Sequence, residues 1–152
     1  QQLKLKIKIR LKDIQSIQQD LIDEFSLFDD WMERYEHMIS LGKSLPLIDP
    51  TLKTDEKLIK GCQSKVWLHS ELKDGKVQFT ADSDAIITKG IVAILVRVFS
   101  NQAPEDIVKA DTDFIDEIGL KEHLSPTRAN GLVSMLKQMK LYAVAYQAQL
   151  KN

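Results

Sequence analysis

The chain has 152 residues, of which 43% are hydrophobic and 28% charged, and its formal net charge is −1. This length fits one domain with a buried core, and the composition argues against whole-chain disorder. The apolar runs all fall well short of the ~20 residues that a membrane-spanning helix needs, so no membrane contact is expected. The only cysteine, Cys62, excludes an intramolecular disulfide and any site that takes two thiolates from one chain. A lone free thiol suits a reducing compartment, and we therefore expect a cytoplasmic protein.

Positive charge is concentrated at the N-terminus. Residues 1–12 carry five basic side chains and no acidic one, and apolar and basic residues alternate from Leu3 to Lys12. Subtracting these charges from the net charge leaves −6 for residues 13–152, which argues against a nucleic-acid partner. Residues 1–12 are either a basic arm for a partner or anionic surface, or a poorly ordered terminus. We place them outside a single domain formed by residues 13–152.

Helical periodicity dominates the first part of this domain. Apolar residues recur at intervals of three and four from Ile14 to Ile39, which predicts helices over 14–25 and 28–41. Ser26 is placed to cap the second helix, and Gly42 is placed to end it in a left-handed conformation.

A polar loop then leads into a segment with strand periodicity. Alternate residues share one face over 65–72, and the pattern resumes over 77–81. Between them lies Asp74-Gly75, a dipeptide typical of β-hairpins because glycine tolerates a positive φ. Residues 57–82 are therefore expected to form a small antiparallel sheet of two or three strands.

Helices return after the sheet. A wide apolar stripe from Ile86 to Val98 predicts a central helix, capped by the polar residues Asp82, Ser83 and Asp84. Gly90 lies inside this helix, where glycine is unfavourable, and we expect it to allow close packing on the sheet.

Three further helical segments are expected in the last third of the chain. Short helices should begin at Pro104 and end at Gly119, and a long one should follow Ser125-Pro126. Because strands are clustered and do not alternate with helices, the predicted fold class is α+β: a small antiparallel sheet packed by helices.

Several catalytic motifs are missing from the sequence. It contains no GxxxxGK[ST] or GxGxxG loop and no GxSxG nucleophile elbow. The three histidines, His37, His69 and His123, are not at metal-ligand spacing. We therefore expect neither a bound cofactor nor a metal on this chain.

Cys62 is the candidate functional residue. It lies on a predicted loop just before a strand, and Gly61 permits an unusual backbone conformation beside it. Lys60 and Lys65 flank it, and nearby positive charge favours the nucleophilic thiolate. No papain-like or caspase-like pattern surrounds the cysteine. Three functions stay open on these residues: a thiol that carries a group, a stand-alone cysteine hydrolase or transferase, and an adaptor whose cysteine is silent.

Four motifs, in one order along the chain, resemble those of the SufE family, and the similarity extends over residues 20–148. The motifs are WMERYEHMISLGKSLP at 31–46, Gly61-Cys62-Gln63-Ser64-Lys65-Val66-Trp67, Asp82-Ser83-Asp84-Ala85 with Lys89-Gly90, and Leu124-Ser125-Pro126 with Arg128 and Gly131-Leu132.

The resemblance implies a fold shared with IscU-like scaffold proteins and a role in iron–sulfur cluster assembly. Cys62 matches the family's cysteine that accepts a persulfide sulfur from a SufS-type cysteine desulfurase, whose pyridoxal phosphate belongs to that partner. Such proteins stimulate the desulfurase and pass sulfur to the SufBCD scaffold, so no independent turnover is expected. IscU-type scaffolds use several cysteines, and a single cysteine therefore disfavours a scaffold function.

The loop around Cys62 is expected to shelter the sulfur in the free protein and to swing outward on docking. Gly61 is the expected hinge, and Gln63 and Ser64 complete the loop. Gln63 is expected either to hydrogen-bond near the sulfur or to serve only as a turn residue.

Asp82, Asp84 and Arg128 are candidates for contact with the desulfurase. Helix capping explains the two aspartates equally well. Arg128 lies near a helix start, where a cation is unfavourable. We therefore expect it to pair with Asp82 or Asp84 inside the fold, or with the partner.

Overall fold

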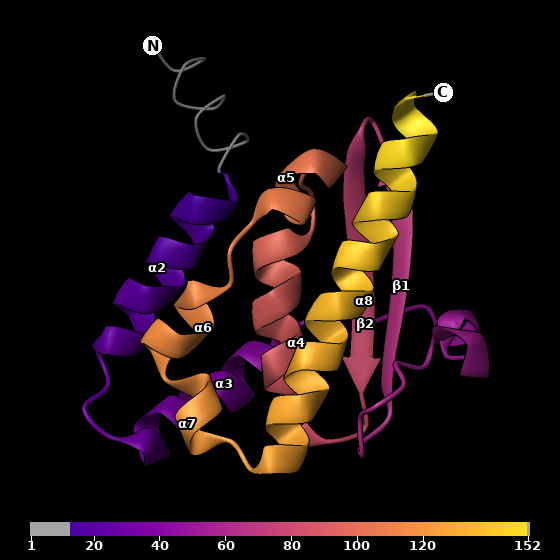
Figure 1. The fold of residues 1–152 in the computed structure, drawn as a ribbon. Coiled ribbons are helices and arrows are strands. Elements are labelled where there is room, and N and C mark those ends of the chain that lie inside the picture. Colours follow the sequence, from indigo (N-terminus) through magenta and orange to yellow (C-terminus); the bar gives the residue numbers. More distant parts are fainter. Residues whose placement is uncertain (1–12, 152) are drawn as a thin grey trace.

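The computed structural model describes residues 13–151, so the predicted basic arm over 1–12 lies outside the described residues. Two α-helices and two short 3₁₀ helices, labelled η, precede a β-hairpin, and five α-helices follow it (Figure 1). The α+β class is confirmed. In chain order the elements are α2 (Ile14–Ser26), α3 (Trp31–Lys43), η1 (Pro50–Leu52), η2 (Asp55–Lys57), β1 (Val66–Lys73), β2 (Lys76–Ser83), α4 (Ile86–Phe99), α5 (Pro104–Lys109), α6 (Asp113–Ile118), α7 (Leu120–His123) and α8 (Pro126–Lys151).

The first two helices are capped by aspartates. Asp13 accepts a hydrogen bond from the Ser16 amide at 2.8 Å, and Asp30 accepts one from the Glu33 amide at 2.9 Å. The prediction that Ser26 caps the second helix is wrong, because Ser26 is the last residue of α2. An aspartate just before the helix satisfies the same free amides.

Two glycines bring α3 and α4 together. A Cβ on Gly90 would lie 2.4 Å from the Met38 carbonyl oxygen, and a Cβ on Gly42 would lie 2.9 Å from the Gly90 amide nitrogen. Gly90 therefore packs on α3, and its predicted packing on the sheet is wrong. The prediction that Gly42 ends its helix is also wrong, since α3 continues to Lys43 and Gly42 lies buried at the crossing. Both glycines are needed for a close approach of two backbones.

The sheet is a single hairpin. β1 and β2 pair antiparallel from Val66↔Ser83 to Lys73↔Lys76, and the turn places Asp74 and Gly75 at φ 52° and 77°. Two isolated bridges, Leu58↔Trp67 and Val77↔Gln102, extend it without adding a third strand among the described residues. Alternate residues face the core, as the periodicity predicts: Val66, Leu68, Val77, Phe79 and Ala81 are buried.

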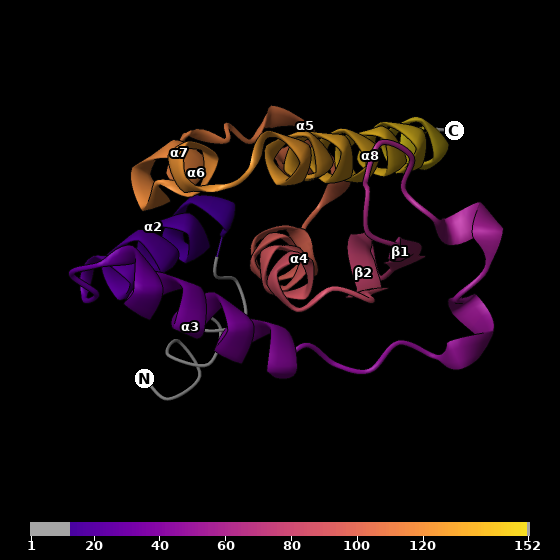
Figure 2. The same ribbon diagram turned by 90° about the horizontal axis from the view of Figure 1, so that it is seen from below.

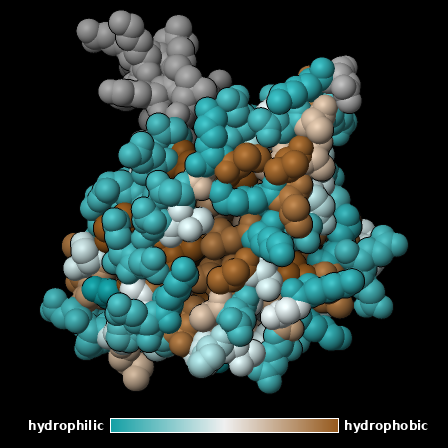
Figure 3. All heavy atoms as spheres, viewed as in Figure 1, coloured by the Kyte–Doolittle hydropathy of each residue, from teal (hydrophilic) through white to brown (hydrophobic). Residues whose placement is uncertain are grey.

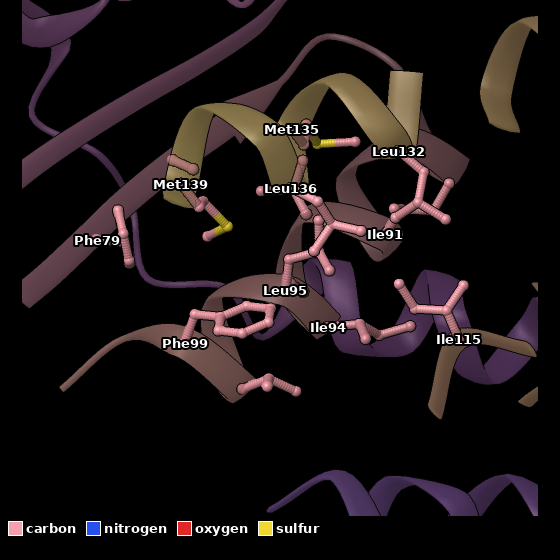
Figure 4. Packing of buried hydrophobic residues seen from close by; sticks show 14 of the residues in the cluster. Phe79, Ile91, Ile94, Leu95, Phe99, Ile115, Leu132, Met135, Leu136 and Met139 are labelled. Carbon is pink, nitrogen blue, oxygen red and sulfur yellow. The ribbon is translucent and has the colours of Figure 1, made fainter. Parts of the chain in front are cut away.

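The central helix α4 and the long helix α8 complete the core. In Figure 2, α8 lies with α5, α6 and α7 in one layer, while α4 and the hairpin lie beneath it. Apolar side chains from α4, α8, α6 and β2 meet between these layers (Figure 4). The Ser70 and Tyr146 hydroxyls hydrogen-bond at 3.0 Å and join β1 to α8. This arrangement places the N-terminal half of α8 beside the residues that precede β1.

The later helix boundaries agree with the predictions. Pro104 occupies the first turn of α5, and Gly119, at φ 87°, ends α6. The Ser125 hydroxyl accepts a hydrogen bond from the Arg128 amide at 3.3 Å, as expected for the cap of α8. No helix in the described part of the chain is both long and apolar enough to cross a membrane.

Replacing Gly90 by alanine tests the close crossing of α3 and α4. In an open helix this change would stabilise the protein by about 1 kcal/mol, because alanine has the higher helix propensity. At this crossing the added methyl group meets the Met38 backbone, so we expect Gly90→Ala to lower the free energy of unfolding by about 1–3 kcal/mol in urea denaturation. Ser40→Ala, at an exposed position of α3, is the control. A gain in stability for Gly90→Ala would contradict the crossing.

Candidate functional site

Hydrogen bonds close the loop that carries Cys62. The Ile59 amide donates to the Val66 carbonyl at 2.9 Å and joins the two ends of the loop. Lys65 is hydrogen-bonded to the last residue of β2 and to the residue after it. Its amide donates to Asp84 Oδ1 at 3.0 Å, and its carbonyl accepts from the Ser83 hydroxyl at 2.9 Å. The loop is therefore tied to the end of β2.

Gly61 turns the chain against α8. Its φ is 91°, a conformation that side chains disfavour. A Cβ on Gly61 would also lie 2.6 Å from Ser134 Oγ, so the Ser134 hydroxyl would have to move for a side chain to fit. The backbone conformation therefore favours glycine at position 61, and the loop contacts α8 at this residue.

The thiol of Cys62 rests against α8 one helical turn earlier. Its Sγ lies 3.7 Å from the Gly131 carbonyl oxygen, to which the thiol donates a weak hydrogen bond. A Cβ on Gly131 would lie 3.4 Å from Sγ, which is an ordinary van der Waals distance, so the thiol packs directly against this part of α8. Cys62 is half-buried here. The sulfur is thus partly sheltered in the free protein, as expected from the sequence.

Burial raises the pKa of the Cys62 thiol above its ordinary value. The sequence-based expectation of a favoured thiolate is therefore wrong for the free protein. Lys60 and Lys65 are both exposed to solvent, where their charge is screened. Desolvation of the sulfur outweighs them, and the neutral thiol is favoured.

A hollow of about 390 Å³ opens beside the thiol. Its polar lining includes the loop residues Gln63 and Ser64 and the α8 residue Arg128, and Ile91 and Met135 supply apolar surface. Arg128 is exposed and has no ion pair with a carboxylate among the described residues. The fold thus brings together four residues predicted from the sequence: Cys62, Gln63, Ser64 and Arg128.

Three other residues of this site were missed by sequence reasoning. Thr88 lies on α4, Thr127 lies in the first turn of α8, and Gly131 receives the thiol. Gly131 belongs to the motif at 124–132 that resembles a SufE motif, and this resemblance could have identified it as a site residue. Nothing in the local sequence connects Thr88 with Cys62, because only packing of α4 against the loop brings them together.

Asp82 lies outside this hollow and is held by two lysines. Its Oδ2 lies 2.6 Å from Lys53 Nζ, and its Oδ1 lies 3.3 Å from Lys89 Nζ. Burial acts to raise the pKa of Asp82, but hydrogen bonds from Lys53, the Ser83 amide and Lys89 outweigh it, so this pKa is lowered. Lys53 also lies over the Trp67 ring, 5.1 Å from its centroid. Asp82 therefore fastens the long loop after α3 to the sheet.

The expected helix cap at 82–84 is wrong. The residue before α4 is Ala85, and no side chain among the described residues caps this helix. Asp84 instead accepts from the Lys65 amide, and neither aspartate pairs with Arg128 in the described structure. Asp84 bonds to the Cys62 loop, and Asp82 bonds to the loop after α3. Both loops are distant in sequence from the start of α4.

The site has a nucleophile but no adjacent base. No histidine or carboxylate lines the hollow in the described residues. His37 and His69 contact glutamates at 2.6 and 3.0 Å, and His123 stacks on Trp31. A cysteine hydrolase needs a base within hydrogen-bond reach of the sulfur. The arrangement instead suits a thiol that exchanges sulfur with another sulfur atom.

Comparison with known families decides the relationship. The family described as SufE, "Fe-S metabolism associated domain", matches residues 19–143. The chain belongs to the SufE family. This membership supports a role in sulfur transfer within iron–sulfur metabolism.

Relatives in several organisms have similar sequences. A SufE-like protein of Rhizobium meliloti is 42% identical over 125 residues, which cover 79% of this chain and 89% of the relative. A SufE-like protein of Synechocystis is 36% identical over 127 residues, which cover 84% of this chain and 80% of the relative. SufE-like protein 1 of Arabidopsis thaliana, named chloroplastic/mitochondrial, is 35% identical over 83% of this chain and 34% of its own length.

A solved structure has the same fold. The solution structure of a hypothetical protein from Thermus thermophilus matches with a TM-score of 0.73, covering 87% of this chain and 96% of the other. The two sequences are 18% identical, so this likeness concerns the fold alone.

The pH dependence of alkylation tests the sheltered thiol of this SufE-family chain. Iodoacetamide reacts with the thiolate, so its rate rises with pH through the pKa of the thiol. Because burial raises this pKa, we expect the midpoint for folded protein to lie at higher pH than the midpoint for urea-unfolded protein. Intact-protein mass spectrometry at a series of times gives both rates. A midpoint for folded protein below that of the unfolded chain would contradict a desolvated thiol.

Proposed function

We propose that this protein accepts a persulfide sulfur on Cys62 from a SufS-type cysteine desulfurase, stimulates that enzyme and passes the sulfur to a SufBCD-type scaffold. The observation that carries this proposal is a half-buried thiol on a closed loop, beside a hollow that no histidine or carboxylate of residues 13–151 lines. Membership of the SufE family supports it. We place this function in the reducing cytoplasm, where a free thiol persists.

The proposed transfer is a displacement at sulfur. The Cys62 thiolate attacks the terminal sulfur of the desulfurase persulfide and forms a new S–S bond. The S–S bond of the donor breaks, and the donor cysteine leaves as a thiolate that takes up a proton. Neither oxidant nor reductant is consumed. Pyridoxal phosphate acts on the desulfurase, before this step, and none is needed on this chain.

Burial and reactivity make opposite demands on Cys62. The site in the free protein favours the neutral thiol, whereas transfer needs the thiolate. We therefore propose that docking swings the loop outward about Gly61. This movement removes the Cys62 sulfur from the site that desolvates it, so the thiolate is no longer disfavoured. The bonds that must break are few, since Lys65 is held by Asp84 and Ser83. After transfer, return of the loop protects the persulfide from small thiols.

Two other functions remain as alternatives with different outcomes. An adaptor with a silent cysteine would stimulate a partner without gaining sulfur. A stand-alone hydrolase or transferase would turn over a substrate without any partner, and the lack of a base beside Cys62 in the part of the chain that the structure describes argues against it.

Intact-protein mass spectrometry tests the transfer. After incubation with a SufS-type desulfurase and free cysteine, we expect the wild-type chain to gain one sulfur atom and Cys62→Ser to gain none. Reduction with a small thiol should remove the added sulfur, because a persulfide is exchangeable. If desulfurase binds and turns over but the wild-type mass is unchanged, the protein is an adaptor and does not carry sulfur.

Hydrogen–deuterium exchange tests the loop movement and the contact through Arg128. We expect desulfurase binding to speed exchange over residues 61–65 in the wild-type chain.

Arg128→Ala should weaken this effect and the stimulation of the desulfurase, with an unchanged unfolding midpoint, because Arg128 is exposed at the rim of the hollow. Arg128→Lys retains the charge and is the matched variant. Slower exchange over 61–65 on binding, or a loss of stability in Arg128→Ala, would contradict these roles.

A further inference from the structure

A second hollow follows the first along α8. It has a volume of about 450 Å³ and lies between residues 56–60 and the middle of α8. We call it the α8 groove and define it by six of its lining residues: Lys57, Leu58, Lys60, Lys137, Leu141 and Tyr142. It is distinct from the hollow beside the thiol, because the two share no lining residue.

The α8 groove is positively charged on an acidic body. Three of its residues are lysines, and Glu56 is the one carboxylate that lines it among the described residues. None of Lys57, Lys60 and Lys137 has an ion pair within the described part of the chain. Residues 13–152 together carry a charge of −6, so this concentration of unpaired cations is local. It favours an anionic occupant.

Apolar surface accompanies these charges. Leu141 is 52% exposed, and Leu58 and Tyr142 are partly exposed. Leu141 belongs to a row of exposed apolar residues on α8, with Val133 and Val144, and apolar side chains are exposed between hydrophilic ones on the face where α8 lies (Figure 3). A small inorganic anion would leave the apolar surface of Leu58, Leu141 and Tyr142 in the groove uncovered. A nucleic acid would favour a longer basic face and arginine forks, and no arginine among residues 13–151 lines the groove.

The α8 groove is continuous with the Cys62 loop. Ser134 lines the groove and is also the residue against which Gly61 packs. Lys60 lies two residues before Cys62. A protein segment bound in the groove therefore reaches the loop without crossing the hollow that contains Arg128.

We propose that the α8 groove binds an acidic, leucine-containing segment of a partner protein. Its carboxylates pair with Lys57, Lys60 and Lys137, and its apolar side chains cover Leu58 and Leu141. The further consequence rests on the proposed function: with the desulfurase docked at the Arg128 side, this segment belongs to the protein that receives sulfur from Cys62.

Titration with a defined peptide tests this groove in the full chain. The probe is a fluorescein-labelled peptide with the sequence Glu-Glu-Leu-Glu-Glu-Leu-Glu-Glu, and a peptide with lysine in place of glutamate is its control. In nitrogen-15 spectra we expect shifts to be confined to residues 57–60 and 134–142. Affinity should fall with added salt because exposed charges are screened.

Charge reversal supplies the decisive variant. We expect K60E/K137E to weaken binding of the acidic peptide about tenfold, because two attractions become repulsions. The matched control, K73E/K151E, reverses two exposed lysines away from the groove and should change affinity by less than about twofold. Thermal unfolding of both variants checks that they remain folded.

Other results would overturn the proposal. These are shifts at the Arg128 hollow in place of the groove, equal binding of the lysine peptide, no response to K60E/K137E, or tighter binding of a short single-stranded oligonucleotide at the same residues. The titration uses neither desulfurase nor sulfur and can be repeated on Cys62→Ser. Its failure is therefore distinguishable from a failure of Cys62 to gain sulfur.

Discussion

The site depends on the packing of the Cys62 loop against α8. Gly61 meets Ser134, and the Cys62 thiol meets Gly131 one turn earlier along the same helix. Because these residues are small, the loop backbone lies close to the helix and the sulfur is half-buried. The raised pKa of the thiol follows from this burial. At φ 91°, a side chain at Gly61 would strain the backbone of the loop.

The position of α8 is in turn set by contacts far from the thiol. Its apolar face packs on α4 and the hairpin, and the Tyr146 hydroxyl bonds to Ser70 on β1. Lys140 donates to the carbonyls of Ile107, Val108 and Ala110 at 3.2, 3.2 and 2.6 Å, which satisfies free acceptors at the end of α5. A single helix thus covers the sheet, holds α5 and receives the functional loop.

Two kinds of contact hold the loop, and they differ in how easily they can be exchanged. The apolar and close-packed contacts with α8 shelter the sulfur. The hydrogen bond from the Lys65 amide to Asp84 is exposed, so water or a partner can replace it, whereas the bond from the buried Ser83 hydroxyl is partly covered. Sheltering in the free protein and release in a complex are therefore compatible, since a partner can reach the bond between Lys65 and Asp84 first.

The local pattern of the sequence determined the elements. Period-two alternation and Asp74-Gly75 predicted the hairpin, the apolar stripe from Ile86 predicted α4, and Gly119 marked the end of a short helix. These features depend on neighbouring residues, whose side-chain faces and backbone φ values are encoded locally. The motif around Cys62 likewise identified the candidate nucleophile, because the residues that mark it are adjacent in the chain.

Tertiary structure alone decided how the elements and polar groups are paired. Gly90 packs on α3 because Gly42 faces it, and Asp82 holds Lys53 and Lys89 where a helix cap was expected. The flanking lysines predicted a thiolate, yet burial against Gly131 favours the neutral thiol. Each outcome depends on a residue distant in sequence, and the cost of burying a charge depends on everything packed around it. Periodicity indicates which face of an element is buried, but only packing decides what lies against it.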